Sequence, residues 1–153
     1  MLDYALFGAA AQIRYTEPVA TLDADVLVAV PAPGRLDVLA PVYEFCASRG
    51  LRPEGESIRV GRWPVQFVPV FSPLTVAAVR EAETADFEGV PFRVVRADYL
   101  AVIALSVGRP KDYARLLALI ESGSVRRDEV RALAALHDLE GAWNRFVSRF
   151  LDE

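Results

Sequence analysis

The chain has 153 residues, with a hydrophobic fraction of 53% and a charged fraction of 25%, a composition that fits one soluble globular domain with a proper core. Charged residues interrupt every apolar run before the ~20 residues that cross a bilayer, and the start Met1-Leu2-Asp3-Tyr4 lacks the basic residues of a secretion signal. The net charge of -4 argues against indiscriminate nucleic-acid binding. We therefore expect a cytoplasmic protein that does not contact the membrane.

The chain begins with a short apolar strand that turns through glycine into a helix. Residues 4–7 predict a buried strand, Gly8 ends it, and residues 9–15 have helical propensity. Such a turn places backbone N–H groups where an anion could sit, and it is equally an ordinary connection of α/β proteins. This segment alone leaves both interpretations open.

Two aspartates precede an apolar stretch over residues 26–30. Side chains alternate faces along a strand, so Asp23 and Asp25 would project from the same side, roughly 7 Å apart. Mg²⁺ is usually held by one or two carboxylates together with substrate phosphates and waters. The pair therefore predicts a divalent-metal site, and the alternative is two solvated carboxylates at the start of a strand.

The middle of the chain predicts a helix, two paired strands, a second helix and a hairpin. Apolar residues recur at helical spacing over residues 36–46, with Pro41 marking a first turn and Cys46 expected in the core. Residues 58–60 and 65–70 predict antiparallel strands, placed near a sheet edge by their prolines. Ser72-Pro73 begins a helix expected to run to Glu83, and residues 84–95 predict a hairpin.

The last third of the chain is helical. We expect helices over residues 97–107, 110–121, 126–136 and 140–151, separated by glycines and by His137-Asp138. No linker is long enough to divide independent domains. The sequence thus predicts an α/β core over residues 1–96 and a helical half over residues 97–153 that packs on it as a single compact unit.

The order of these motifs resembles that of the nucleotidyltransferase superfamily, near its small AbiEii-toxin-like members from bacterial abortive-infection and toxin-antitoxin systems. The resemblance implies an α/β (α+β) fold, with a mixed sheet, flanking helices and a C-terminal helical half. The matching stretches are Phe7-Gly8-Ala9-Ala10, Pro18-Val19-Ala20-Thr21-Leu22-Asp23-Ala24-Asp25-Val26, Pro64-Val65-Gln66-Phe67-Val68-Pro69 and Arg109-Pro110-Lys111-Asp112-Tyr113-Ala114-Arg115.

The resemblance also implies roles for single residues. Asp23 and Asp25 match the paired aspartates that hold Mg²⁺ or Mn²⁺ over a nucleoside triphosphate. Lys111, the sole lysine of the chain, matches a basic residue that faces the nucleotide. The expected catalytic residues are thus Asp23, Asp25 and Lys111, and the expected nucleotide-binding residues are Gly8, Ala9, Thr21, Gln66, Lys111 and Asp112.

Two positions depart from the family's pattern. The family's turn commonly has serine after its glycine, where this chain has Ala9. A third carboxylate often lies on a later strand, and the aligned position is Gln66, whose amide coordinates metals weakly and cannot accept a proton at neutral pH. Glu56 or Asp86 could supply that carboxylate instead, although their segments look like loop and hairpin.

The leading hypothesis is a Mg²⁺-dependent nucleotidyltransferase-like protein. It would bind a nucleoside triphosphate and, if active, transfer a nucleoside monophosphate to a hydroxyl of tRNA, a protein or a small molecule. The alternative is an inactive binding or assembly module with a small antitoxin-like partner. A third hypothesis is an unrelated domain in which the aspartates are merely solvated.

The remaining polar and aromatic candidates are expected to have structural roles. His137 is interpreted as a helix cap or surface residue, and Trp63 as a core or interface aromatic, with base stacking as the alternative. Arg126, Arg127 and Arg131 could contact an RNA end, but neighbouring acidic residues favour a solvated mixed face.

Overall fold

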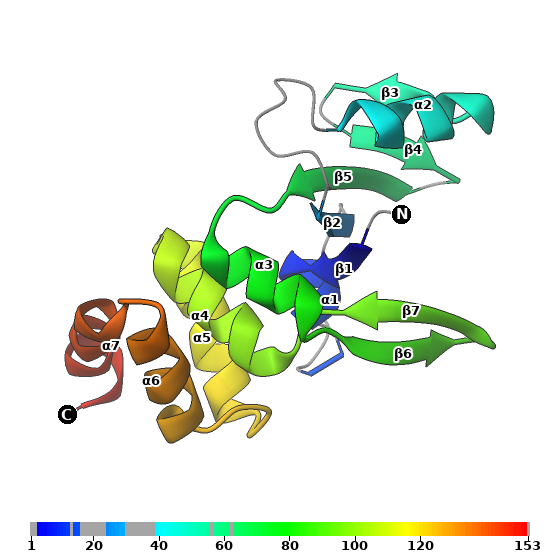
Figure 1. Cartoon of the computed structure of the whole chain (residues 1–153). Helices are drawn as coiled ribbons and strands as arrows, with labels where there is room; N and C mark the ends of the chain where they lie inside the picture. The colour runs from blue at the N-terminus through cyan, green and yellow to red at the C-terminus, as the bar shows by residue number, and fades with distance from the viewer. Residues whose placement is uncertain are drawn as a thin grey trace. The chain divides into compact units, whose positions relative to one another are not determined.

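The computed structural model describes residues 3–12, 14–15, 24–29, 39–55, 57–61 and 63–152. The described residues divide into two compact units, a sheet unit from Met1–Ala11 and Val19–Val95 and a helical unit from Gln12–Pro18 and Arg96–Glu153. The elements, coloured along the chain in Figure 1, are β1 (Asp3–Phe7), α1 (Gly8–Gln12), β2 (Ala24–Ala29), α2 (Ala40–Ser48), β3 (Pro53–Glu54), β4 (Ser57–Val60), β5 (Trp63–Pro69), α3 (Pro73–Arg80), β6 (Glu83–Phe87), β7 (Val90–Val94), α4 (Ala97–Val107), α5 (Pro110–Glu121), α6 (Arg127–Leu136), α7 (Glu140–Phe146) and a π-helix, η1 (Val147–Leu151).

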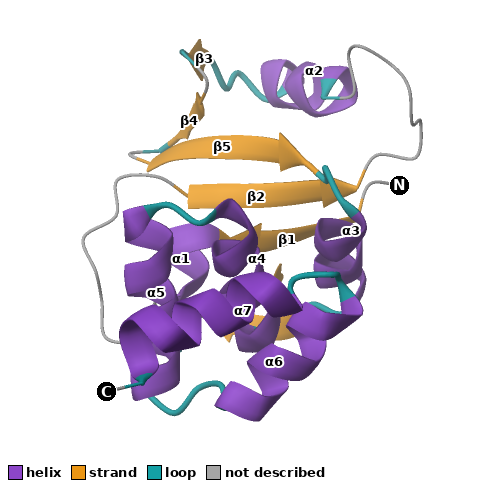
Figure 2. Ribbon diagram, turned by 90° about the vertical axis from the view of Figure 1, so that its left-hand side faces the viewer, coloured by secondary structure: helices purple, strands orange, loops and turns teal. Residues whose placement is uncertain are grey.

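The described strands form one mixed sheet in the order β3-β4-β5-β2-β1-β7-β6. β2 pairs with β5 in parallel and with β1 antiparallel, and β1 pairs with β7 in parallel. Figure 2 shows β5, β2 and β1 side by side at the centre of the sheet. The mixed α/β class expected from the sequence is therefore confirmed.

One face of the sheet unit is closed by α2. Val26 and Val28 alternate with Asp25 and Leu27 along β2, so the two pairs point to opposite faces. The valines belong to the face that packs against α2, where the buried cluster consists of Val28, Val42, Cys46 and Ile58 with Val26, Leu39, Leu51 and Phe67 packed against it. Cys46 is thus a core residue, as expected, and Asp25 points away from α2.

The prolines of the sheet unit lie where the backbone can do without their N–H groups. Pro41 lies in the first turn of α2, where its missing N–H costs no helical hydrogen bond. The strands β4 and β5, expected towards a sheet edge, are second and third from one end of the sheet. Pro64 and Pro69 lie near the two ends of β5, where the loss of a ladder donor is tolerated.

Helix α3 begins as expected and ends early. The Ser72 side chain accepts a hydrogen bond from the backbone N–H of Thr75 at 3.2 Å, and the Thr75 hydroxyl accepts one from the N–H of Ser72 at 3.0 Å. The expected end at Glu83 is wrong, because that residue begins β6. The guanidinium of Arg93 donates to the carbonyl of Val79 at 2.8 Å, which caps the end of the helix.

The helical unit is organised around α4, which is apolar on all sides. Its residues Tyr99 to Leu105 are all buried, and α5, α6 and α7 each contact it. Trp143 is buried in this unit. Trp63 of the sheet unit is 51% exposed, so it is not a core residue, and the interface role expected as the other option stays a prediction. None of the described helices is long and apolar enough to span a membrane.

Candidate functional site

The candidate site begins where β1 turns into α1. Gly8 starts α1 with a φ of +71°, in the left-handed region that glycine adopts most readily. A Cβ atom built on Gly8 would lie 2.7 Å from Oδ2 of Asp25. The carboxylate of Asp25 therefore packs directly against the backbone at Gly8, and only glycine leaves room for it.

Gln66 is the neighbour of Asp25 on the other side. Asp25 pairs with Gln66 across the parallel β2–β5 ladder and with Phe7 across the antiparallel β1–β2 ladder. Paired residues on adjacent strands, about 4.8 Å apart, have side chains on the same face. Gly8, Asp25 and Gln66 thus form one polar corner of the sheet, here called the Gly8 corner.

The structure places the other expected site residues in three different situations. Thr21 and Asp23 lie outside the described residues, as does Glu56, and of Ala9 the structure describes only its backbone in α1. Asp86 lies on the edge strand β6, where its Oδ1 accepts a hydrogen bond from the N–H of Gly89 at 2.8 Å. Asp86 is therefore a turn residue of the hairpin and is not paired with β2.

Lys111 lies in the first turn of α5, in the helical unit. Its side chain is exposed, and within the described ranges no hydrogen bond or ion pair holds its ammonium group. That Lys111 and Asp25 act on one nucleotide stays a prediction.

Asp112 has a structural environment that the sequence did not reveal. Its carboxylate is 2% exposed and accepts hydrogen bonds from Nε of Arg109 at 2.6 Å, from its Nη2 at 3.2 Å and from its backbone N–H at 3.1 Å. Arg115 Nη1 lies 3.5 Å from the same carboxylate. Burial alone would raise the pKa of Asp112, but the hydrogen bonds from Arg109 outweigh it and hold the pKa below the ordinary 3.8.

Gln12 is a further residue that sequence reasoning missed. It is 5% exposed, and its Nε2 donates to the backbone carbonyl of Arg115 at 3.1 Å. Close by in sequence, the carbonyl of Tyr15 accepts a hydrogen bond from the hydroxyl of Ser124 at 2.6 Å. Gln12 and Tyr15 belong to the helical unit and are hydrogen-bonded within it, and the helical propensity of their segment gave no signal for these partners.

The fold was compared with those of solved structures. A crystal structure of an antigenic nucleotidyltransferase-like protein from Paracoccidioides brasiliensis aligns with a TM-score of 0.52 and 12% identity, over 94% of this chain and 84% of that one. The chain has a nucleotidyltransferase-like fold. The solution structure of the antibiotic-resistance factor ANT(2″)-Ia aligns with a TM-score of 0.50 and 15% identity, over 97% of this chain and 89% of the other. No protein-family model and no curated protein matches the sequence.

The Gly8 corner brings together two side chains with oxygen atoms that could ligate a metal ion. It offers the Asp25 carboxylate, seated in the space that a Cβ at Gly8 would fill, and the amide oxygen of Gln66. Within the described part of the chain no group of three or more His, Cys, Asp or Glu residues could hold a metal ion. Mg²⁺ is the ion that proteins usually bind through few side chains, because it keeps waters and takes phosphate oxygens.

Replacing Gly8 should show how closely Asp25 approaches. We expect Gly8→Ala to lower the free energy of unfolding by about 1 kcal/mol more than Gly50→Ala, because both substitutions force an alanine into the left-handed conformation but only the first brings a methyl group against a carboxylate. Gly50 has a φ of +74° and no atom within 4 Å of its built Cβ, so it is a matched control. Equal losses in urea unfolding of the two variants would contradict the close approach.

Replacing Asp112 should change both stability and its pH dependence. Asp112→Asn leaves Arg109 without its buried carboxylate. We therefore expect the free energy of unfolding to fall by about 2 kcal/mol at pH 7. Because the folded pKa of Asp112 is lowered, its contribution is complete above about pH 4 and is lost as the pH falls through the folded pKa. The difference in unfolding temperature between wild type and Asp112→Asn should therefore become smaller below pH 4. Asp128→Asn changes an exposed carboxylate, so its stability should stay close to that of wild type at every pH.

Proposed function

We propose that this protein binds a nucleoside triphosphate with Mg²⁺ at the Gly8 corner and transfers a nucleoside monophosphate to a hydroxyl group. The observation that carries the proposal is the packing of the Asp25 carboxylate against Gly8 in a chain of nucleotidyltransferase-like fold. A carboxylate held this way is fixed in position before a ligand arrives, which reduces the cost of ordering it on binding.

Asp25 and Asp23 are proposed to hold the Mg²⁺ ion, for which Mn²⁺ could substitute. When bound, the ion supplies positive charge that offsets the phosphate oxygens. Asp23 precedes Asp25 by two residues, the spacing at which a strand presents two side chains on one side, and a shared side for the two carboxylates is part of the proposal. With so few protein ligands, we expect either ion alone to bind weakly without the triphosphate.

The other residues of the proposed site bind and orient the nucleotide. Gln66 has an amide N–H that can donate to a phosphate or ribose oxygen, and Lys111 supplies a compact positive charge. Ala9 and Thr21 remain in the proposed nucleotide-binding set. Asp112 would act indirectly, by holding Arg109 and Arg115 at the start of the helix that carries Lys111.

The proposed reaction is an in-line displacement at the α-phosphorus. The acceptor oxygen forms a bond to that phosphorus, the bond to the β,γ-pyrophosphate breaks, and pyrophosphate leaves. The hydroxyl proton passes to water or to an aspartate, because the Gln66 amide cannot take it at neutral pH. The acceptor belongs to tRNA, a protein or a small molecule. The AbiEii-like grouping and an antitoxin-like partner rest on the sequence motifs and remain part of the proposal.

A second candidate function is nucleotide binding without turnover. The pairing of Gln66 with Asp25 favours it, because an amide stands at the position where the family often has a third carboxylate. Such a protein would be a binding or assembly module. The two candidates share the nucleotide site and differ in whether pyrophosphate is released.

The nucleotide site is tested with Asp25→Asn. We expect the wild-type chain to bind non-hydrolysable nucleoside triphosphates in Mg²⁺ buffer, and the variant to lose at least about tenfold in affinity, because a carboxylate ligand is removed. Asp86→Asn makes the same change at the edge hairpin and should bind like wild type. Isothermal titration calorimetry with analogues of ATP, GTP, CTP and UTP measures both variants. Equal affinities in wild type and Asp25→Asn would overturn the site.

The two candidate functions are separated with Gln66→Glu. Placing a second carboxylate beside Asp25 should raise Mn²⁺ affinity by about tenfold or more, whereas Thr84→Glu, an equal change of charge on exposed β6, should leave it unchanged. Pyrophosphate release is then measured with triphosphate, Mg²⁺ and total tRNA or lysate protein. Pyrophosphate release by wild type supports the transferase. Pyrophosphate release by Gln66→Glu but not by wild type supports a wild-type protein that binds nucleotide without turnover. Unchanged Mn²⁺ affinity in Gln66→Glu would show that the two side chains do not face a common ligand.

A further inference from the structure

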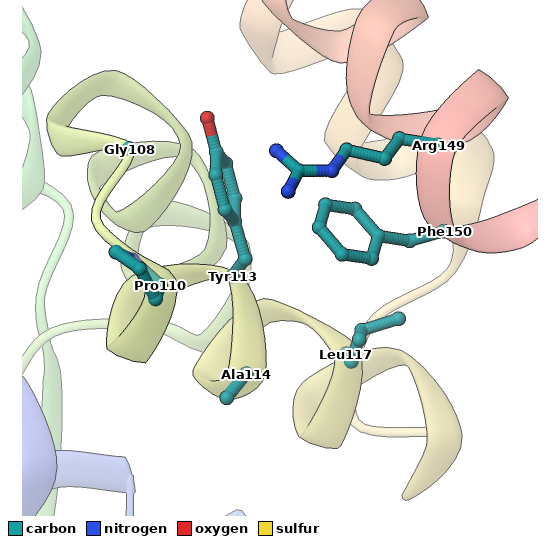
Figure 3. A pocket seen from close by; sticks show the side chains of 7 residues that line it. All are labelled: Gly108, Pro110, Tyr113, Ala114, Leu117, Arg149 and Phe150. Carbon is teal, nitrogen blue, oxygen red and sulfur yellow. The ribbon is translucent and has the colours of Figure 1, made fainter.

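The helical unit contains a pocket whose lining residues are not among the proposed nucleotide-binding residues. Its volume is about 370 Å³, within the range of roughly 300–1,000 Å³ found for small-molecule sites. One side is formed by α5, including Pro110 and Leu117, and the other by Arg149 and Phe150 of η1 (Figure 3). π-helical turns such as η1 occur frequently at functional sites.

An aromatic wall supports this pocket. The rings of Tyr113 and Phe150 lie 5.3 Å apart between centroids and are tilted by 41°. Both contact Phe146, which is 2% exposed and fixes the wall to the core of the helical unit. Phe150 remains 36% exposed, so the wall offers apolar surface to a planar ring.

Arg149 brings a positive charge to this wall. Its guanidinium carbon lies 4.9 Å from the centroid of the Phe150 ring. Figure 3 shows the guanidinium beside that ring and directed toward Tyr113. Stacking uses the flat face of a guanidinium, so its N–H groups stay available in the plane, and in the part of the chain that the structure describes no ion pair or hydrogen bond engages them.

The hydroxyl of Tyr113 adds a second polar group. A Cβ built on Gly108 would lie 3.1 Å from it, so the glycine that ends α4 also makes room for the phenol. Among the described residues this hydroxyl has no hydrogen-bond partner. The pocket thus combines apolar walls with a cation on one side and a hydroxyl donor near Gly108.

We propose that this pocket binds a small aromatic carboxylic acid of one or two rings. The ring packs against Tyr113 and Leu117, and the carboxylate accepts two hydrogen bonds from Arg149, which Phe150 positions. Charge complementarity selects the acid, because an exposed guanidinium beside apolar surface, with no carboxylate partner among the described residues, favours an anion over a neutral ligand. This binding site goes beyond the proposed nucleotide function and does not depend on it.

The proposal is tested with a charged probe and its neutral counterpart. In titration calorimetry of the full chain at pH 7.5, we expect indole-3-acetate to bind at least about tenfold more tightly than indole-3-acetamide, since hydrogen bonds to charged groups are the stronger ones. Arg149→Gln should remove this preference and leave amide affinity nearly unchanged. Arg145→Gln, at another exposed arginine one turn earlier, should retain the preference.

A second variant tests the stacking of Arg149 on Phe150. Phe150→Leu retains an apolar side chain but removes the stacking face under Arg149, so the preference for the acid should shrink while circular dichroism confirms the fold. Equal binding of acid and amide to wild type, an unchanged preference in Arg149→Gln, or no binding of either probe at millimolar concentration would each overturn the proposal.

Discussion

The packing of a carboxylate onto a glycine backbone is the constraint on which the candidate site depends. At most strand-to-helix turns a side chain would occupy the space above the first helical residue. Here that space holds the Oδ2 atom of Asp25, which lies 2.7 Å from the position that a Cβ of residue 8 would have. The positive φ of Gly8 is a second reason for glycine at this position. Two independent requirements thus fix one glycine. The ladders β1–β2 and β2–β5 then determine what surrounds the carboxylate, because they place Phe7 and Gln66 beside it.

Part of this arrangement could be predicted from the sequence because it depends on local chemistry. A strand followed by glycine and a helix, a proline in a first helical turn at Pro41, and a serine cap before Pro73 are features that a few neighbouring residues decide. Gln66 pairs with Asp25 across β2 and β5, and that it stands at the position of the third carboxylate stays a prediction. Periodicity predicted a sheet-rich first part followed by helices, the family resemblance implied that the sheet is mixed, and both are confirmed.

Other features could not be predicted because partners distant in sequence decide them. Two prolines placed the strand pair towards a sheet edge, but they could not show that β5 pairs on both sides, with the prolines near its two ends. Asp112 looked like a companion of Lys111 at a nucleotide, whereas its carboxylate is buried under Arg109 and Arg115 and stabilises the start of α5. The contact between Gln12 and the Arg115 carbonyl joins residues 103 positions apart, and no periodicity signals it. The aromatic wall of the pocket likewise depends on how α5 and η1 meet within the helical unit.

The fold similarity and the site geometry answer different questions. Structures only 12% and 15% identical to this chain support its architecture, and an architecture can carry many activities. Function must therefore be argued from the residues of a site. The proposed function rests on the Gly8 corner, where one carboxylate and one amide share a face.

The most direct test is paramagnetic NMR of the full chain titrated with Mn²⁺ in the presence of a non-hydrolysable nucleoside triphosphate, because Mn²⁺ broadens only signals close to it. The account predicts that the backbone amide signals of Gly8, Asp25 and Gln66 broaden first, and that those of Thr84 and Val90 on the far hairpin stay sharp. Broadening centred on other acidic residues, with Gly8 and Asp25 unaffected, would contradict it.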